Sequence, residues 1–118
     1  MKEKTYSPLE WEEQEILVKW LEFKNISFSS IPNSTWTSSL AQKIKNKRQG
    51  LRGGLPDLLI IHDSKMLFIE LKRRTGGVIS SRQKVWIERI NTVSNCQAIV
   101  ARGANEAIEQ IKKILVIK

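Results

Sequence analysis

Two carboxylates and one lysine stand at the ends of two consecutive apolar runs. Asp57 directly precedes the run 58–62, and Glu70 and Lys72 close the run 66–72. Side chains alternate across a strand, so Glu70 and Lys72 are expected on one face. The turn residues at 63–64 make the two runs a β-hairpin, in which the start of one strand lies beside the end of its partner. The pattern therefore predicts that Asp57, Glu70 and Lys72 meet at one end of a sheet.

This combination of side chains suits phosphodiester hydrolysis. Two carboxylates can hold a hard divalent cation and leave coordination places for water and phosphate. The cation offsets charge on the phosphate and makes a water more acidic, and a nearby lysine can orient that water. The backbone carbonyl of Leu71 is a further candidate ligand. Taken singly, Asp57 would be expected to cap a turn and Glu70 and Lys72 to form an ion pair; the ordered set favours catalysis.

The elements that must position these residues begin with a helix near the N-terminus. Ser7 as the N-cap, Pro8 at the first helical position and Glu10 as a capping-box acid predict a helix from 8 to about 24. Its expected apolar stripe is Leu9, Ile16, Leu17, Trp20 and Leu21.

The rest of the chain alternates between strand and helix patterns. The expected elements are a strand at 25–31, a short helix to 48 capped by Ser38 or Ser39, the hairpin strands, a second long helix opening at 80–83, a strand at 97–101 and a helix at 105–115. The second long helix is expected to carry an apolar stripe made of Val85, Trp86, Ile90 and Val93, and the last helix is expected to face inward with Ala107, Ile108, Ile111 and Ile114. This order predicts one α/β domain, residues 1–118, with a central mixed four-stranded sheet flanked by helices.

Composition narrows the class of partner. Twenty Lys and Arg against twelve Asp and Glu leave a net charge of +8, which favours a polyanion. The first predicted helix is rich in glutamate, unlike a membrane-binding helix with a lysine-rich polar face, so nucleic acid is favoured over a membrane. No apolar run reaches the roughly 20 residues needed to span a bilayer, and the charged residues 1–4, with no apolar run after them, predict no signal peptide. The single cysteine, Cys96, fits a reducing cytoplasm, bacterial or of a phage-infected host.

Basic residues flank the predicted acidic site on both sides. They would let a phosphate backbone approach carboxylates that otherwise repel it, through contacts that are independent of base sequence. The candidate DNA-binding residues are Lys43, Lys45, Lys47, Arg48 and Arg52 before the hairpin, and Arg73 and Arg74 after it.

At these residues the chain resembles the virus-type replication-repair nuclease (VRR-NUC) family of the PD-(D/E)xK nuclease superfamily. The resemblance covers most of the chain, and the full ordered set of motifs is specific. The matching motifs are Glu10-Trp11-Glu12-Glu13-Gln14 with Trp20-Leu21, Ile31-Pro32-Asn33, Gly54-Leu55-Pro56-Asp57, Leu67-Phe68-Ile69-Glu70-Leu71-Lys72, and Gly77-x-x-Ser80-x-x-Gln83-x-x-Trp86.

The resemblance implies DNA cleavage that depends on Mg²⁺ or Mn²⁺. It also implies a structure-specific endonuclease of phage type that acts on branched DNA, such as four-way junctions, as a homodimer. Carried over, Asp57 and Glu70 become metal ligands and Lys72 the catalytic lysine.

An acidic residue of the first helix completes the implied site, and two are open. The Glu-x-x-x-Gln spacing favours Glu10, whereas the helical wheel places Glu13 in the apolar stripe, where an unpaired carboxylate needs an explanation. Gln83 is implied at the active site too, although Ser80 and Gln83 also form a capping box.

Two other functions compete with the nuclease. One is a non-catalytic DNA-binding accessory protein on a nuclease fold, against which the intact set of Asp57, Glu70 and Lys72 argues. The other is a hydrolase of RNA or nucleotides, for which the sequence offers no phosphate-binding loop.

Overall fold

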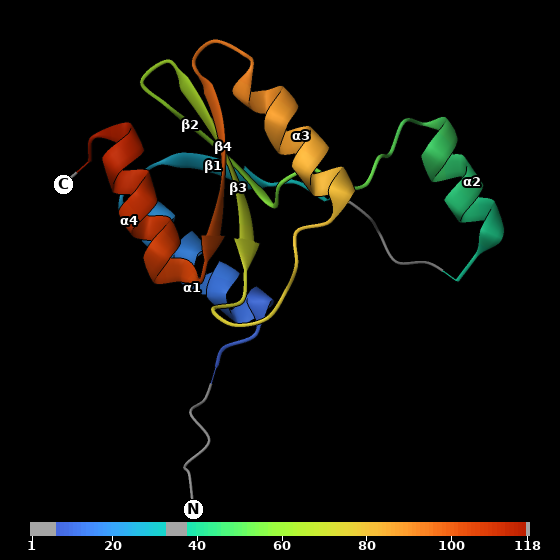
Figure 1. Cartoon of the computed structure of the whole chain (residues 1–118), viewed down its shortest axis with the longest axis horizontal. Coiled ribbons are helices and arrows are strands. Elements are labelled where there is room, and N and C mark those ends of the chain that lie inside the picture. The colour runs from blue at the N-terminus through green and yellow to red at the C-terminus, as the bar shows by residue number, and fades with distance from the viewer. Residues whose placement is uncertain (1–6, 33–37, 118) are drawn as a thin grey trace, which may run out of the picture.

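A mixed sheet with helices on both faces forms the centre of the computed structural model, which describes residues 7–32 and 38–117 (Figure 1). The strands are ordered β1-β2-β3-β4 across the sheet. In chain order the elements are α1 (Glu10–Phe23), β1 (Ser27–Ser30), α2 (Leu40–Arg48), β2 (Leu58–His62), β3 (Lys65–Lys72), α3 (Ser81–Asn91), β4 (Cys96–Arg102) and α4 (Ala104–Leu115). The predicted α/β class and mixed four-stranded sheet are confirmed.

The pairing of the strands explains where the helices lie. β1, β2 and β3 pair antiparallel in succession, whereas β3 and β4 pair parallel. A parallel pair needs a crossover connection, and α3 provides it on one face of the sheet. Helices α1 and α4 pack together on the opposite face.

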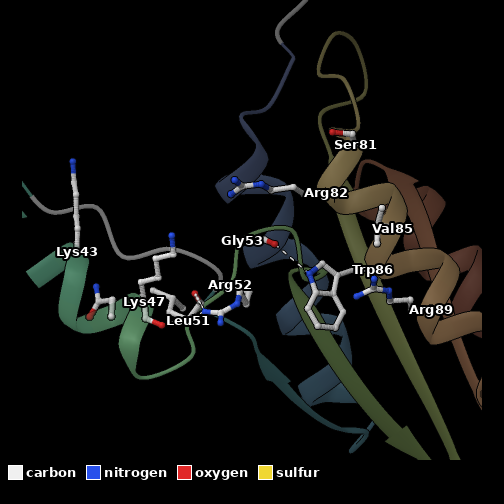
Figure 2. Close-up of a pocket in the computed structure, with 11 residues that line it drawn as sticks. Lys43, Lys47, Leu51, Arg52, Gly53, Ser81, Arg82, Val85, Trp86 and Arg89 are labelled. Carbon is white, nitrogen blue, oxygen red and sulfur yellow. Dashed lines mark hydrogen bonds between the residues drawn. The ribbon is translucent and has the colours of Figure 1, made fainter.

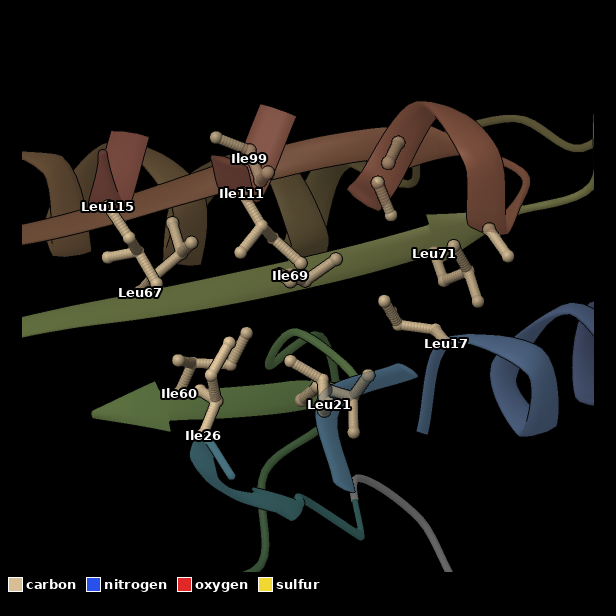
Figure 3. Packing of buried hydrophobic residues seen from close by; sticks show 14 residues of the cluster. Leu17, Leu21, Ile26, Ile60, Leu67, Ile69, Leu71, Ile99, Ile111 and Leu115 are labelled. Atoms are coloured by element: carbon tan, nitrogen blue, oxygen red, sulfur yellow. The ribbon is translucent and has the colours of Figure 1, made fainter. Parts of the chain in front are cut away.

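The apolar core lies between the sheet and the pair α1 and α4 (Figure 3). From Leu67 onward every second residue of β3 points into it, namely Leu67, Ile69 and Leu71. Leu17 and Leu21 from α1 and Ile111 and Leu115 from α4 close over them. Burying each of these side chains contributes roughly 1.5–3 kcal/mol, so this layer holds β3 firmly in place.

The other face of the sheet is covered less completely. Helix α3 packs on the edge strand β4, where the side-chain amide of Asn91 both donates to and accepts from the backbone of Ala98. None of the residues of α3 is buried, and Val85 and Val93 are exposed. The predicted apolar stripe of this helix is therefore wrong at two positions: α3 packs mainly on β4, which leaves Val85 exposed, and the helix ends at Asn91, before Val93.

The start of α1 differs from the prediction. The helix begins at Glu10 and its N-cap is Leu9, whose N–H donates to the Glu12 carboxylate at 3.0 Å. Ser7 and Pro8 thus precede the helix, and Glu12 rather than Glu10 takes the capping-box role. Leu9 and Ile16 are also exposed, contrary to the predicted stripe.

The remaining boundaries agree with the sequence to within two residues. The first strand starts at Ser27, after Asn25 turns the chain with a φ of 55°. Helix α2 is capped by Ser39, whose hydroxyl accepts from the Gln42 N–H. Among the residues that the structure describes, no helix is long and apolar enough to cross a membrane.

Candidate active site

Three carboxylates from three different elements converge at one end of the sheet. One oxygen each of Glu10, Asp57 and Glu70 lies within 4.8 Å of the others. Glu10 opens α1, Asp57 stands directly before β2, and Glu70 is in the last half of β3. The hairpin and the N-terminus of α1 therefore bring together residues up to 60 positions apart in the sequence.

Asp57 is held by its backbone and by its side chain. Its carbonyl oxygen accepts from the Ile31 N–H at 2.8 Å, which ties it to the end of β1. Its Oδ2 accepts from the Leu71 N–H, also at 2.8 Å. The last paired residues of the hairpin are Leu58 and Ile69, so Leu71 extends beyond the end of β2 and the Asp57 side chain takes the place of a strand partner.

The loop that leads to Asp57 is fitted against the start of α3. Gly54 has a φ of +99°, and a Cβ there would lie 2.8 Å from the backbone of Arg82. The indole N–H of Trp86 donates to the Gly53 carbonyl at 3.2 Å. A side chain at position 54 would push α3 away from the loop, so the glycine is required for both its conformation and its close approach.

Glu70 and Lys72 lie on the face of β3 opposite the core residues, as the alternation predicts. Both are nearly inaccessible, with 1% of Glu70 and 9% of Lys72 exposed. The Lys72 Nζ is 3.4 Å from Glu70 Oε1. The amide of Gln83 donates to the same oxygen at 2.9 Å.

Gln83 performs two tasks at once. Its side-chain oxygen accepts from the Ser80 N–H while the Ser80 hydroxyl accepts from the Gln83 N–H, which is the predicted capping box. Its amide nitrogen is left free to reach Glu70. The cap therefore orients the side chain that contacts the acidic site.

The three carboxylates are held at an electrostatic cost. Burial, with the neighbouring charge of Asp57, raises the pKa of Glu70 to about 7. Burial raises the pKa of Asp57 as well, although the Leu71 N–H and Lys72 oppose that change. The pKa of Glu10 is raised by burial and by Asp57. Carboxyl groups in this state are stabilised by any cation that binds between them.

One oxygen in the cluster makes no hydrogen bond. Within the described part of the chain, Glu70 Oε2 is buried and has no hydrogen-bond partner. Buried polar atoms are seldom left in this condition unless an ion or water completes them. The donor set, made of carboxylate oxygens alone, fits a hard divalent cation such as Mg²⁺ or Mn²⁺.

The second candidate of the first helix, Glu13, lies in different surroundings. It is fully buried and accepts from Arg74, at 3.1 and 3.2 Å to Nη2 and Nε, and from the Ala104 N–H at the start of α4. A Cβ at Gly103 would lie 2.7 Å from its Oε2. Glu13 thus joins α1 to α4, and the carboxylate that reaches Asp57 and Glu70 is that of Glu10.

The predicted basic residues divide into two groups. Arg74 pairs with Glu13, and Arg73 donates to the carbonyls of Ser7 and Pro8. Lys43, Lys47 and Arg52 line a groove between α2 and α3, whereas Lys45 and Arg48 do not line it. Two arginines that the sequence analysis did not single out, Arg82 and Arg89, line the groove from α3. Their seven-residue spacing puts them on one side of a helix and was the available signal.

The fold and the site together define an α/β domain that holds three carboxylates and a buried lysine at the end of a β-hairpin. The sequence model of the VRR-NUC domain matches residues 3–105, so the chain belongs to the VRR-NUC family of nuclease domains. A solved structure described as a VRR_NUC domain protein has the same fold, with a TM-score of 0.72, 24% identity, and coverage of 96% of this chain and 93% of that one. The curated proteins contain no match.

Proposed function

We propose that this chain is a Mg²⁺- or Mn²⁺-dependent endonuclease that hydrolyses phosphodiester bonds of DNA. The observation that carries the proposal is the cluster of Glu10, Asp57 and Glu70, with the unsatisfied Glu70 Oε2 among its oxygens. Membership of a nuclease family supports the same reaction.

Glu10, Asp57 and Glu70 would hold the cation, with the Leu71 carbonyl as a further candidate ligand. When bound, the cation would offset the negative charge of the phosphate and make a water more acidic. The Lys72 ammonium lies beside Glu70 and is able to orient the attacking water and to contact a phosphate oxygen. Gln83 holds Glu70 Oε1 and acts as a positioning residue.

Branched DNA such as a four-way junction, cut by a homodimer, is the proposed substrate and assembly. One acidic site cuts one strand, and resolution of a junction needs two cuts that a two-fold dimer supplies. Exposed apolar side chains offer candidate surfaces for a second copy, and they are Leu40 and Ile44 of α2, Val93 after the end of α3, and Ile61 and Met66 of the sheet.

Cleavage assays on a panel of DNA structures test this proposal. Labelled linear duplex, flap, single-stranded and four-way junction DNA are incubated with protein in Mg²⁺, Mn²⁺ or EDTA. We expect metal-dependent cleavage that is fastest on the junction. We expect no cleavage by Asp57→Asn, which replaces the carboxylate with an uncharged side chain of nearly the same size. Equal cleavage by wild type and Asp57→Asn would contradict the metal site.

Light scattering over the same concentrations tests the dimer. A monomer that cuts junctions no better than linear duplex would contradict the homodimer and the branched substrate, and would leave the metal site standing.

A further inference from the structure

A hollow lies between α2 and α3, beside the acidic site. It has a volume of about 950 Å³ (Figure 2). Eleven residues line it, and they are Lys43, Asn46, Lys47, Leu51, Arg52, Gly53, Ser81, Arg82, Val85, Trp86 and Arg89. We call this hollow the α2–α3 groove.

The charge of the α2–α3 groove has one sign. Five of its lining residues are cationic, and none is acidic. The cations come from both walls: Lys43 and Lys47 from α2, and Arg82 and Arg89 from α3 (Figure 2). Cations that face one another across a hollow repel unless an anion lies between them, so the α2–α3 groove is suited to a polyanion.

One end of the α2–α3 groove adjoins the acidic site. Arg82 and Gly53 line that end, and the guanidinium of Arg82 lies 3.6 Å from where a Cβ on Gly53 would be. Gln83, the next residue after Arg82, donates to Glu70. A chain of phosphates that enters the α2–α3 groove can therefore continue to the carboxylate cluster.

The length of the α2–α3 groove matches a few nucleotides. Arg82 and Arg89 are seven residues apart on α3, which is about 10 Å at a rise of 1.5 Å per residue. Phosphates along one strand of B-form DNA rise by about 3.4 Å each along the helix axis and lie farther apart along the winding backbone, so this wall spans at most about three of them. Trp86 and Val85 lie between the two arginines and offer an apolar surface to sugars and bases.

We propose that the α2–α3 groove binds the sugar–phosphate backbone of the nucleic-acid strand that runs on from the scissile phosphate. This inference rests on the proposed nuclease function and adds a second binding site to it. The charge argues against a second copy of the chain as the occupant, because its own α2–α3 groove would bring five more cations.

Two pairs of substitutions that remove the same charge test the inference. Lys47→Ala with Arg89→Ala removes one cation from each wall of the α2–α3 groove. Lys84→Ala with Lys113→Ala removes two exposed cations, one from α3 and one from α4, outside the groove. None of the four is placed in the acidic site.

Binding is measured by fluorescence anisotropy in EDTA, with single-stranded and duplex DNA of ~20 nucleotides at several salt concentrations. The groove pair should weaken binding about tenfold or more and lower the salt slope by about 1.4 for a single strand or 1.8 for a duplex. The control pair should change affinity less than about threefold, since these lysines make no groove contact. The probe that shows the difference identifies the strand form that the groove holds.

Equal losses from the two pairs would overturn the inference, because they would mean that net charge alone matters. A groove pair that becomes monomeric in light scattering while it keeps its DNA affinity would also overturn it, and would assign the surface to a second copy. Because the assay contains no metal, its outcome is independent of whether the protein cleaves DNA.

Discussion

Two buried glutamates of this protein differ in the charged and polar groups that surround their carboxylates. Glu13 and Glu70 are almost equally inaccessible, with 0% and 1% exposed. Glu13 is met by the Arg74 guanidinium and by an N–H at the start of α4, where a helix favours negative charge. Glu70 is met by Lys72 and Gln83 on one oxygen, has no hydrogen bond on the other, and lies close to two more carboxylates.

The charge of Glu13 therefore stabilises the fold, whereas the charge of Glu70 destabilises it. Arg74 and the Ala104 N–H pair with both oxygens of the Glu13 carboxylate, so this residue stabilises the protein without any bound ligand. The environment of Glu70 raises its pKa to about 7, so part of the folding free energy is given up to keep the carboxylate there. Arrangements of this second kind are typical of functional sites.

The largest effect on activity is expected from removing the charge of Glu70. Glu70→Gln should lower the rate of DNA cleavage by about 10³-fold or more, since it removes a proposed metal ligand at the reacting centre. That factor corresponds to about 4 kcal/mol of activation free energy. Single-turnover rates in Mg²⁺ and Mn²⁺ measure it. Cleavage within a few-fold of wild type would remove the distinction between the two glutamates.

The second prediction concerns stability against pH in EDTA. Between the unfolded pKa of 4.5 and the folded pKa of about 7, the native protein holds a proton on Glu70 that the unfolded chain has released. Stability should therefore fall as pH rises through this window, by up to about 3 kcal/mol.

Urea denaturation from pH 5 to pH 8 measures this dependence, with Glu70→Gln as the matched control. The variant should show a flatter profile and exceed wild type at pH 8, because it lacks the buried charge. Identical profiles for the two proteins would contradict the raised pKa.

A third prediction exchanges the two glutamates of α1. Glu13→Gln should lower the free energy of unfolding by about 2 kcal/mol, because the pairing with Arg74 loses its charge. Its cleavage rate per folded molecule should be nearly that of wild type. Glu10→Gln should do the reverse, with a large loss of rate and little loss of stability. Thermal melts and single-turnover rates on both variants decide between them, and a rate defect confined to Glu13→Gln would reassign the site.

The smallest effect is expected at the helix cap that supports Glu70. Ser80→Ala should cost about 1 kcal/mol of stability, the usual value of an N-cap side chain. Cleavage should slow by a few-fold, because the hydroxyl that accepts from the Gln83 N–H is lost and the first turn of α3, which carries the Gln83 side chain, is held less firmly. Ser39→Ala, at the N-cap of α2, is the control: it removes an equivalent cap that touches no part of the acidic site. Equal changes in rate for the two variants would show that the cap of α3 is only structural.

The sequence predicted what depends on neighbours in the chain. Alternation along a strand and the geometry of a hairpin are local, so Asp57, Glu70 and Lys72 were placed together correctly. The choice between Glu10 and Glu13 was beyond such reasoning, because Arg74 is 61 residues from Glu13 in the sequence. The helical wheel identified Glu13 as inward-facing, and the motif identified Glu10, and both were right about geometry.

Sequence patterns also could not predict how much of the apolar side of each helix the sheet covers. An apolar stripe shows which side of a helix faces protein, but the area it meets depends on where the helix lies. Helix α3 meets mainly the edge strand β4, which leaves Val85 exposed, and the helix ends at Asn91, before Val93. The α2–α3 groove depends on the same long-range placement, so Arg82 and Arg89 had no visible partner in the sequence.

The alternation of β3 also bears on how this protein can change over evolutionary time. Leu67, Ile69 and Leu71 of the strand fill the core, and Glu70 and Lys72 take the alternate places among the carboxylates and beside α3. Deleting or inserting one residue before Glu70 would exchange the two sets, burying charge among leucines and turning apolar side chains toward the site. A protein with such a change would not fold, whatever the change did to the active site. Selection for folding alone therefore preserves the position of Glu70 relative to the core residues of β3.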